Sequence, residues 1–185
     1  MPKSTIKEER IIAETRLFRI YEREVEHPDG KIEKWEQTEY KGEGVRIFAV
    51  TPNQNLILIR EFRSEYDEDV SPRLPTGNID EGETAEDATR RELREETGYE
   101  PQNIEPIEVM GRTSSYYRNT THLMFCSELI KVGVPEKNIT LLPIPFHQIH
   151  EKINDLFVVD PFSIYGILRG IQFLQGKKQI EYEYC

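Results

Sequence analysis

Three glutamates, Glu92, Glu95 and Glu96, lie within little more than one helical turn of each other, in the segment from Gly77 to Tyr99. On a helix, residues 92 and 96 share one face because each residue turns the chain by about 100°. Like charges at this spacing destabilise a helix by roughly 0.2–0.5 kcal/mol per pair. Clustered carboxylate oxygens are the ligands that Mg²⁺ and Mn²⁺ take, usually together with substrate phosphates. The spacing therefore indicates either a divalent-metal site or a solvated helix face with paired charges.

The residues around these glutamates predict a short helix whose two ends are both fixed. Thr84 is placed to cap the start, with Asp87 three residues later as the reciprocal partner of a capping box. Gly98 is placed to end the helix in a left-handed conformation. Ala88 and Leu93 lie on or beside the stripe that carries the glutamates. Because an apolar stripe turns toward its own protein, we expect the carboxylates to point inward.

The spacing of the whole segment is more specific than its composition. It runs Gly77, five residues, Glu83, seven residues, Arg91, Glu92, Leu93, one residue, Glu95, Glu96, one residue, Gly98 and the apolar Tyr99. This spacing matches every fixed position of the signature of the Nudix hydrolases, and the chain resembles that family. The resemblance implies an α/β fold, an α/β/α sandwich with a mixed sheet, with the signature helix against that sheet.

The resemblance also implies which residues bind metal. Glu92 and Glu96 would be the main ligands of Mg²⁺, with Mn²⁺ as a substitute. Glu95 would complete the ligand set or polarise a water molecule, and the backbone carbonyl of Thr76 would add a ligand from the preceding loop. Such ions neutralise charge on the bridging and leaving oxygens of a phosphoanhydride and help to place a water in line.

Other residues would orient this set or activate the water. By the family pattern, Glu83 and Arg91 would hold the constellation in place, since arginine can grip carboxylates by two hydrogen bonds. The alternative for Arg91 is an ordinary exposed ion pair with Glu95. In relatives that cleave ADP-ribose, a loop after the sheet supplies a glutamate as general base. The corresponding stretch here is GVPEKNI, whose one acid, Glu136, is a candidate base or simply a solvated side chain.

Two arginines are candidates for the substrate phosphates. Arg60 and Arg63 lie in the segment REFR, which directly follows the apolar strand expected at residues 56–59. The ADP-ribose and nucleotide-sugar branch of the family commonly has a phosphate-binding arginine that matches Arg63. The alternative is a pair of solvated arginines at a strand end.

The chain departs from that branch in two places. Arg73 stands where the branch often has glutamate, and Ser115–Asn119 replace a small Pro-Gly loop. Tyr117 could stack a base and Arg118 could contact a phosphate, although tyrosines in a loop are as often packing residues. These departures leave the substrate open.

The rest of the chain predicts a sheet and a final helix. Residues 17–40 alternate around a turn at Asp29 and Gly30 and predict a long hairpin. Asp160 and Pro161 are placed as N-cap and first residue of a helix that runs to Gly176. We expect an N-terminal antiparallel hairpin at 1–43, a dimerisation element in many nucleotide-sugar-cleaving relatives, and a Nudix domain at 44–185. The strands expected in that domain are residues 45–50, 56–59, 104–110, 122–130 and 139–144.

Charge and cysteine content exclude several other classes. The 185 residues include 24 basic and 34 acidic side chains, a formal charge of −10. This charge argues against broad binding to nucleic acid or anionic membranes. The first residues lack an apolar signal-peptide core, and two cysteines make no disulfide framework, so we expect a cytoplasmic protein.

The sequence thus predicts a Mg²⁺-dependent enzyme that hydrolyses the pyrophosphate link of a nucleoside diphosphate derivative, ADP-ribose or a nucleotide sugar, as a homodimer. Two alternatives stay open. One keeps the chemistry on nucleoside triphosphates or dinucleoside polyphosphates, and the other is a non-catalytic nucleotide-sensing module.

Overall fold

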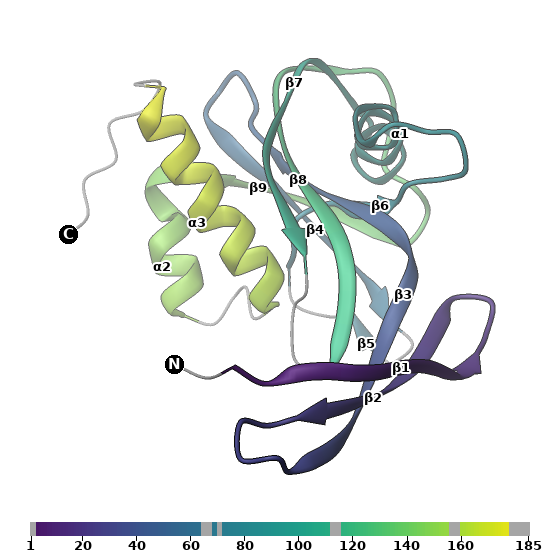
Figure 1. The fold of residues 1–185 in the computed structure, drawn as a ribbon. Helices are drawn as coiled ribbons and strands as arrows, with labels where there is room; N and C mark the ends of the chain where they lie inside the picture. Colours follow the sequence, from purple (N-terminus) through teal and green to yellow (C-terminus); the bar gives the residue numbers. More distant parts are fainter. Residues whose placement is uncertain (1–2, 64–67, 70–71, 112–115, 156–159, 178–185) are drawn as a thin grey trace. The chain divides into compact units, whose positions relative to one another are not determined.

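A computed structural model of the chain describes residues 3–63, 68–69, 72–111, 116–155 and 160–177 (Figure 1). The side chains of residues 62, 63, 68 and 69 lie outside this description. The chain divides into two compact units, one formed by Met1–Glu43 with Met110–Thr121 and the other by Gly44–Val109 with His122–Cys185. The strands are β1 (Thr5–Glu14), β2 (Phe18–Glu26), β3 (Ile32–Ala49), β4 (Asn55–Arg63), β5 (Glu68–Asp69), β6 (Thr76–Asn78), β7 (Tyr99–Gly111), β8 (Tyr117–Lys131) and β9 (Ile139–Pro145). The helices are α1 (Ala85–Thr97), the 3-10 helix η1 (Phe146–Gln148), α2 (Ile149–Asn154) and α3 (Pro161–Gly176).

The N-terminal unit is built on an antiparallel hairpin, as the sequence predicts. β2 pairs antiparallel with β3, from Phe18 opposite Tyr40 to Glu26 opposite Ile32. Gly30 lies in the turn with φ of 82°, a conformation that glycine adopts without strain. A further strand, β1, pairs antiparallel with β2 and was not expected. Every residue of β1 is exposed, so it lacks the half-buried alternation that marks a strand in sequence.

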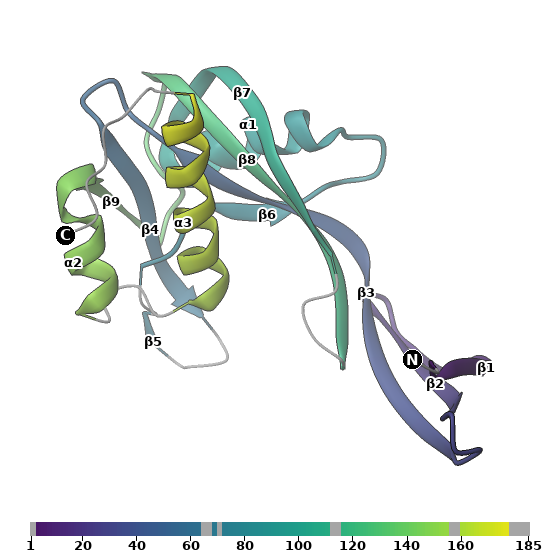
Figure 2. The same ribbon diagram turned by 60° about the vertical axis from the view of Figure 1, so that its left-hand side comes forward.

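Strand β3 corrects the expected break between the hairpin and the first core strand. It runs without interruption from Ile32 to Ala49 through Gly42 and Gly44 (Figure 2). Gly44 lies so close to β6 that a Cβ atom there would be 3.0 Å from the carbonyl oxygen of Gly77. The glycine therefore permits a close approach of two backbones and does not end the strand.

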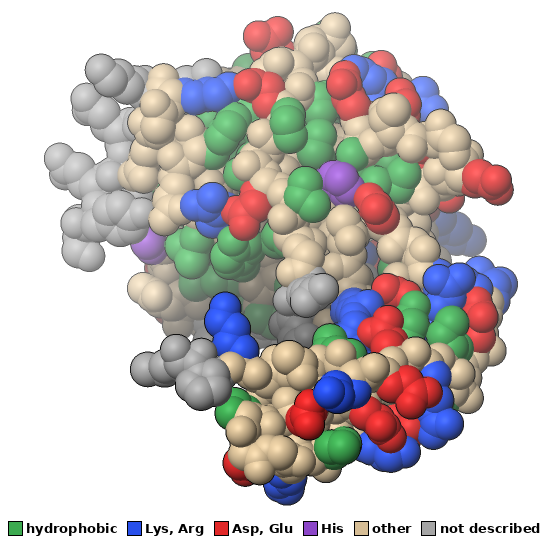
Figure 3. Space-filling model, in the orientation of Figure 1, with side chains coloured by type: hydrophobic (Ala, Val, Ile, Leu, Met, Phe, Trp, Pro, Cys, Tyr) green, Lys and Arg blue, Asp and Glu red, His purple; other side chains and the backbone are tan. Residues whose placement is uncertain are grey.

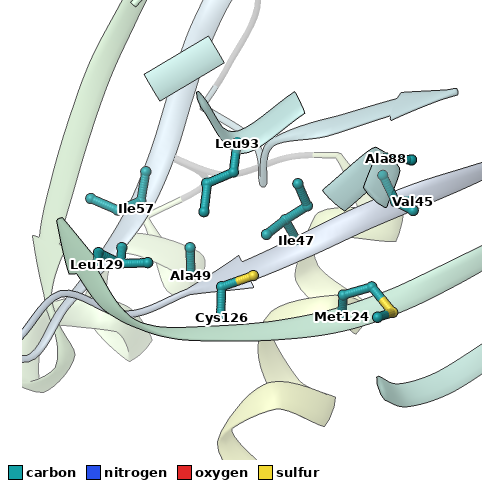
Figure 4. Close-up of a cluster of buried hydrophobic side chains, with 9 residues drawn as sticks. All are labelled: Val45, Ile47, Ala49, Ile57, Ala88, Leu93, Met124, Cys126 and Leu129. Carbon is teal, nitrogen blue, oxygen red and sulfur yellow. The ribbon is translucent and has the colours of Figure 1, made fainter. Parts of the chain in front are cut away.

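In the second unit, alternate residues of β3 face two different helical layers. Ile47 and Ala49 belong to a buried cluster that includes Leu93 of α1 (Figure 4). Phe48, between them, faces the other way, because a Cβ atom on Gly170 of α3 would lie 2.4 Å from its ring. This period of two places α1 on one side of the strands and α3 on the other, as Figures 1 and 2 show.

The described strands form two sheets. One has the order β1-β2-β3-β8-β7 with β6 paired to β3, and the other has the order β5-β4-β9. The predicted strands 56–59, 104–110, 122–130 and 139–144 lie within β4, β7, β8 and β9. The expected α/β/α sandwich with a mixed arrangement of strands is confirmed.

Helix α3 begins as predicted and is fixed to β3 by a polar cluster. Asp160 caps it and accepts a hydrogen bond from the Ser163 amide at 2.9 Å. Arg46 of β3 donates to both Asp160 and Ser163 at 2.7 Å. The Ser163 hydroxyl also accepts from the Leu74 amide at 2.9 Å, which ties the helix to the segment before β6. Among the described residues, no helix is both long and apolar enough to cross a membrane.

Candidate active site

Helix α1 has the two predicted caps. Thr84 and Asp87 form the reciprocal capping box, and Gly98 ends the helix with φ of 72°. The Gly98 carbonyl accepts from the amides of Val132 and Gly133 at 2.9 and 3.0 Å. A Cβ atom on Gly98 would lie 2.5 Å from the Gly133 carbonyl oxygen, so the helix end packs directly on that loop. Both ends of the glutamate-bearing helix are therefore fixed.

Arg91 connects the loop before the helix to the carboxylates on it. Its guanidinium holds Glu83 by two hydrogen bonds, Nε to Oε1 at 2.8 Å and Nη2 to Oε2 at 2.9 Å. The same group donates to Glu92 at 2.7 Å and more weakly to Glu95 at 3.4 Å. It also donates to the carbonyl of Asn78 in β6 at 2.9 Å. The contact with Glu95 is thus one of several, and Arg91 fixes the position of Glu92.

Glu92 lies against the backbone of strand β6, which precedes the helix. A Cβ atom on Gly77 would lie 1.9 Å from the carboxyl carbon of Glu92, so only glycine leaves room for this carboxylate. Burial raises the pKa of Glu92, and the hydrogen bond and charge of Arg91 oppose that rise. The Glu92 carboxylate therefore lies beside strand β6, which also contains Thr76.

Glu96 is the most deeply buried carboxylate of the signature, with 6% of its surface exposed. Its Oε2 accepts a hydrogen bond from the Thr76 amide at 2.9 Å. Its Oε1 lies 3.8 Å from Nη2 of Arg73, which also donates to Glu61. Burial raises the pKa of Glu96 to about 8, although the charge of Arg73 and the Thr76 hydrogen bond act in the opposite direction. The inward orientation expected for Glu92 and Glu96 is therefore present.

Two residues of this cluster were not assigned a role from the sequence. Glu61 comes from β4 and Arg73 from the segment before β6, and Arg73 is 6% exposed. The sequence does mark Arg73 as a departure from the family pattern, but its partners lie 12 and 23 residues away along the chain. A contact between separate elements of this kind gives no local signal.

The other predicted residues lie in several places. The Glu136 amide donates to the carbonyl of Glu95 at 2.9 Å, so the GVPEKNI loop lies at the C-terminal end of α1, with Glu136 exposed. Arg60 lies in β4, where its backbone is opposite Thr140 of β9. Arg63 ends β4, and its side chain lies outside the described residues, as does all of Ser115.

Tyr117 and Arg118 belong to the N-terminal unit. Arg118 lies 3.5 Å from the carboxylates of Glu9 and Glu39, and its guanidinium lies over the Tyr21 ring at 5.4 Å. Burial raises the pKa of Tyr117. The structure thus places the Arg118 guanidinium beside two acidic side chains and one aromatic ring of its own unit.

The acidic cluster has the donor chemistry that a divalent metal ion requires. Glu92 and Glu96 offer hard carboxylate oxygens, and the space beside Gly77 brings one of them against the turn at Thr76. In the part of the chain that the structure describes, no three His, Cys, Asp or Glu side chains already converge on one point. Arg91 lies beside Glu92, and Arg73 lies beside Glu96. The carboxylate oxygens present fit a site for Mg²⁺ or Mn²⁺.

Comparison with known proteins shows the family and the fold of the chain. The chain is 30% identical over 183 residues to an ADP-ribose pyrophosphatase of Bacillus subtilis (strain 168), an alignment that covers 94% of this chain and 96% of that protein. It is 23% identical to the methanol dehydrogenase activator of Bacillus methanolicus, over 98% of this chain and 97% of that protein. The crystal structure of an ADP compounds hydrolase has the same fold, with a TM-score of 0.82, 21% identity and coverage of 96% and 97%. The NUDIX domain model matches residues 41–153, and the chain belongs to the Nudix hydrolase family.

Proposed function

We propose that this enzyme hydrolyses the pyrophosphate link of a nucleoside diphosphate derivative, with Mg²⁺ as its metal ion. One observation supports this most directly. Burial raises the pKa values of Glu92 and Glu96, and both carboxylates lie beside strand β6, at Gly77 and Thr76. A buried carboxylate pair of this kind is stabilised when a divalent cation supplies the missing positive charge.

In this proposal, Glu92, Glu96 and the Thr76 carbonyl hold the metal, and Glu95 completes the set or polarises water. When bound, the metal supplies charge neutralisation on the phosphate oxygens. Arg91 keeps Glu92 in its rotamer through the fixed pair with Glu83. The solvent-exposed Glu136, at the end of α1, is the candidate to accept a proton from the attacking water.

We propose ADP-ribose or a nucleotide sugar as the substrate. The support is the similarity along almost the whole chain to a protein described as an ADP-ribose pyrophosphatase. Arg60 and Arg63, which follow the apolar part of β4, would then bind the pyrophosphate as local cations in an acidic protein.

We also propose that the N-terminal unit makes the protein a homodimer. It exposes apolar side chains, with Ile6, Ile11 and Trp35 at 56%, 50% and 43%. Exposed apolar side chains gathered on a few strands are typical of protein interfaces. Light scattering of the purified full chain would measure the mass directly.

The test of the catalytic proposal is product analysis by mass spectrometry in ¹⁸O-labelled water, over ADP-ribose, nucleotide sugars, nucleoside triphosphates and dinucleoside polyphosphates. We expect AMP or another nucleoside monophosphate together with a phosphorylated sugar, and no turnover without Mg²⁺ or Mn²⁺. The E96Q variant should lose at least about 100-fold in kcat, since a metal's charge stabilisation is worth several kcal/mol. Full turnover by E96Q would refute the assigned mechanism, and released pyrophosphate would favour a nucleoside triphosphate substrate.

A further inference from the structure

The Arg73 guanidinium lies between two carboxylates from different elements. Its Nη2 donates to Glu61 of β4 and lies 3.8 Å from Oε1 of Glu96 on α1. All three side chains are largely shielded from water. The exposed fraction of the side chain alone is 8% for Arg73, 19% for Glu61 and 9% for Glu96. In such surroundings a charge is screened far less than at the surface, so this one cation has a strong effect on both acids.

The backbone holds Arg73 at this point. Its amide donates to the Ile59 carbonyl and its carbonyl accepts from the Ile59 amide, both at 2.9 Å. This pair of hydrogen bonds fixes Arg73 opposite Ile59 of β4, and Glu61 follows two residues after Ile59 in the same strand. The Thr76 amide donates a hydrogen bond to the other carboxylate oxygen of Glu96, Oε2, at 2.9 Å. Both oxygens of Glu96 therefore face groups from the single segment 73–76.

We propose that Arg73 is an internal counter-ion of the metal site. Arg73 holds Glu96 in the metal-free enzyme, and it competes with the divalent ion for the same oxygen of Glu96. This inference rests on the proposed function, because it takes Glu96 as a metal ligand. Arg73 acts through Glu96 and is thus a positioning residue. Its physical effect is to keep the buried acids ordered without metal and to lower the affinity for metal.

Two consequences follow, and they have opposite signs. Without Arg73, Glu61 and Glu96 lose the guanidinium that lies beside both of them, and the metal-free protein loses stability. A divalent ion then meets a more negative site with no competing guanidinium, so its affinity rises. A residue with a purely structural role would lower the affinity when it is removed, because the site would lose order.

The experiment is a titration of the full chain with Mn²⁺ alone, followed by electron paramagnetic resonance of the free ion, together with melting temperatures with and without Mn²⁺. We expect R73Q to bind Mn²⁺ at least about tenfold more tightly than the wild type, because a nearby cation is removed. R73K keeps the charge and should restore an affinity close to that of the wild type. The melting temperature of R73Q should fall without Mn²⁺ and recover when Mn²⁺ is added.

The matched control is R46Q, which removes the half-buried arginine that binds the N-cap Asp160 and Ser163 of α3. It should lower the melting temperature and leave the Mn²⁺ affinity unchanged. If R73Q does not fold, the double variant R73Q/E61Q removes both charges of one ion pair, and it should bind Mn²⁺ more tightly than E61Q.

Unchanged or weaker Mn²⁺ binding in R73Q, or in R73Q/E61Q relative to E61Q, would overturn the role of Arg73. A wild-type protein that binds no Mn²⁺ would instead overturn the proposed function. The two failures are therefore distinguishable in one titration series.

Discussion

The strands of the N-terminal unit and the helix α1 are both rich in glutamate and arginine, yet burial shifts the pKa of Glu92 and Glu96 on α1 in the direction opposite to that of the paired glutamates on the strands. On the strands, basic and acidic side chains are intermixed at the surface (Figure 3). There, the hydrogen bond from Arg10 lowers the pKa of Glu22, and Lys31 with His27 lowers that of Glu33 to about 2. On α1, burial raises the pKa of Glu92 and of Glu96.

The difference shows that the number of carboxylates does not make a site. The surface glutamates of the N-terminal unit are paired side by side with cations and keep their contact with water, so their ionised form is favoured. Glu96 also has a cation nearby, but the loss of water outweighs that cation. What distinguishes the two regions is burial, and the buried region is the one suited to a divalent ion.

The largest effect should come from G77A, which places a methyl group where the Glu92 carboxylate lies. The new Cβ would lie 1.9 Å from the Glu92 carboxyl carbon, so the carboxylate must move out of its place. We expect kcat/KM to fall by about 100-fold, because the metal's charge stabilisation is worth several kcal/mol. The melting temperature should change little, because the displaced group is the end of a flexible side chain.

The control is G111A at the end of β7, where a Cβ atom would meet nothing within 4 Å. Its kcat/KM and melting temperature should match those of the wild type. Wild-type activity in G77A would mean that the position of Glu92 against the turn does not matter for turnover.

A smaller effect concerns Glu83, which should resemble the surface glutamate Glu33 in its pH dependence and differ from it in its effect on turnover. The Arg91 hydrogen bonds, with one from the Asp80 amide, lower the pKa of Glu83 to about 2, close to that of Glu33. Because the pKa is lower in the folded state, each carboxylate stabilises the protein above about pH 4.5, and the benefit disappears as the pH falls toward 2. E83Q and E33Q should therefore melt below the wild type at pH 7 and approach it between pH 4.5 and 2.

Turnover distinguishes the two variants. E83Q should lose about 10–100-fold in activity, as is usual when a residue that orients a metal ligand is removed. E33Q, in the N-terminal unit, should keep full activity. A gap in melting temperature between E83Q and the wild type that stays constant down to pH 2 would contradict the assigned ion pair.

The smallest effect concerns the buried thiol of Cys126. Burial raises the pKa of the Cys126 thiol to about 12, and its surface is fully covered. In a C185S variant, where Cys126 is the one remaining cysteine, iodoacetamide at pH 8 should not label the folded protein and should label it in guanidinium. Rapid labelling of the folded variant would show that this core opens readily.

The features that the sequence predicts well are those encoded by neighbouring residues. Thr84, Asp87 and Gly98 cap α1 as expected, and Asp160 caps α3, because each cap depends on groups within a few residues. The antiparallel hairpin with Gly30 in its turn follows from the same kind of local pattern.

The features that the sequence does not predict depend on contacts between distant segments. Strand β1 is exposed throughout and therefore carries no alternation. The grouping of Glu61, Arg73 and Glu96 joins a strand, a loop and a helix, and nothing near any one of them indicates the other two. The motif thus predicts Arg91 beside Glu92 but not Arg73 beside Glu96.

The anchoring of α1 at both ends restricts how the motif can vary in length. Its start is tied to the loop through Glu83 and Arg91, and its end packs on Gly133. One residue inserted between Thr84 and Gly98 would rotate everything after it by about 100° and carry Glu96 away from Thr76. A substitution in this segment leaves the other side chains in register, whereas an insertion or deletion before Glu96 changes the position of Glu96 relative to Thr76.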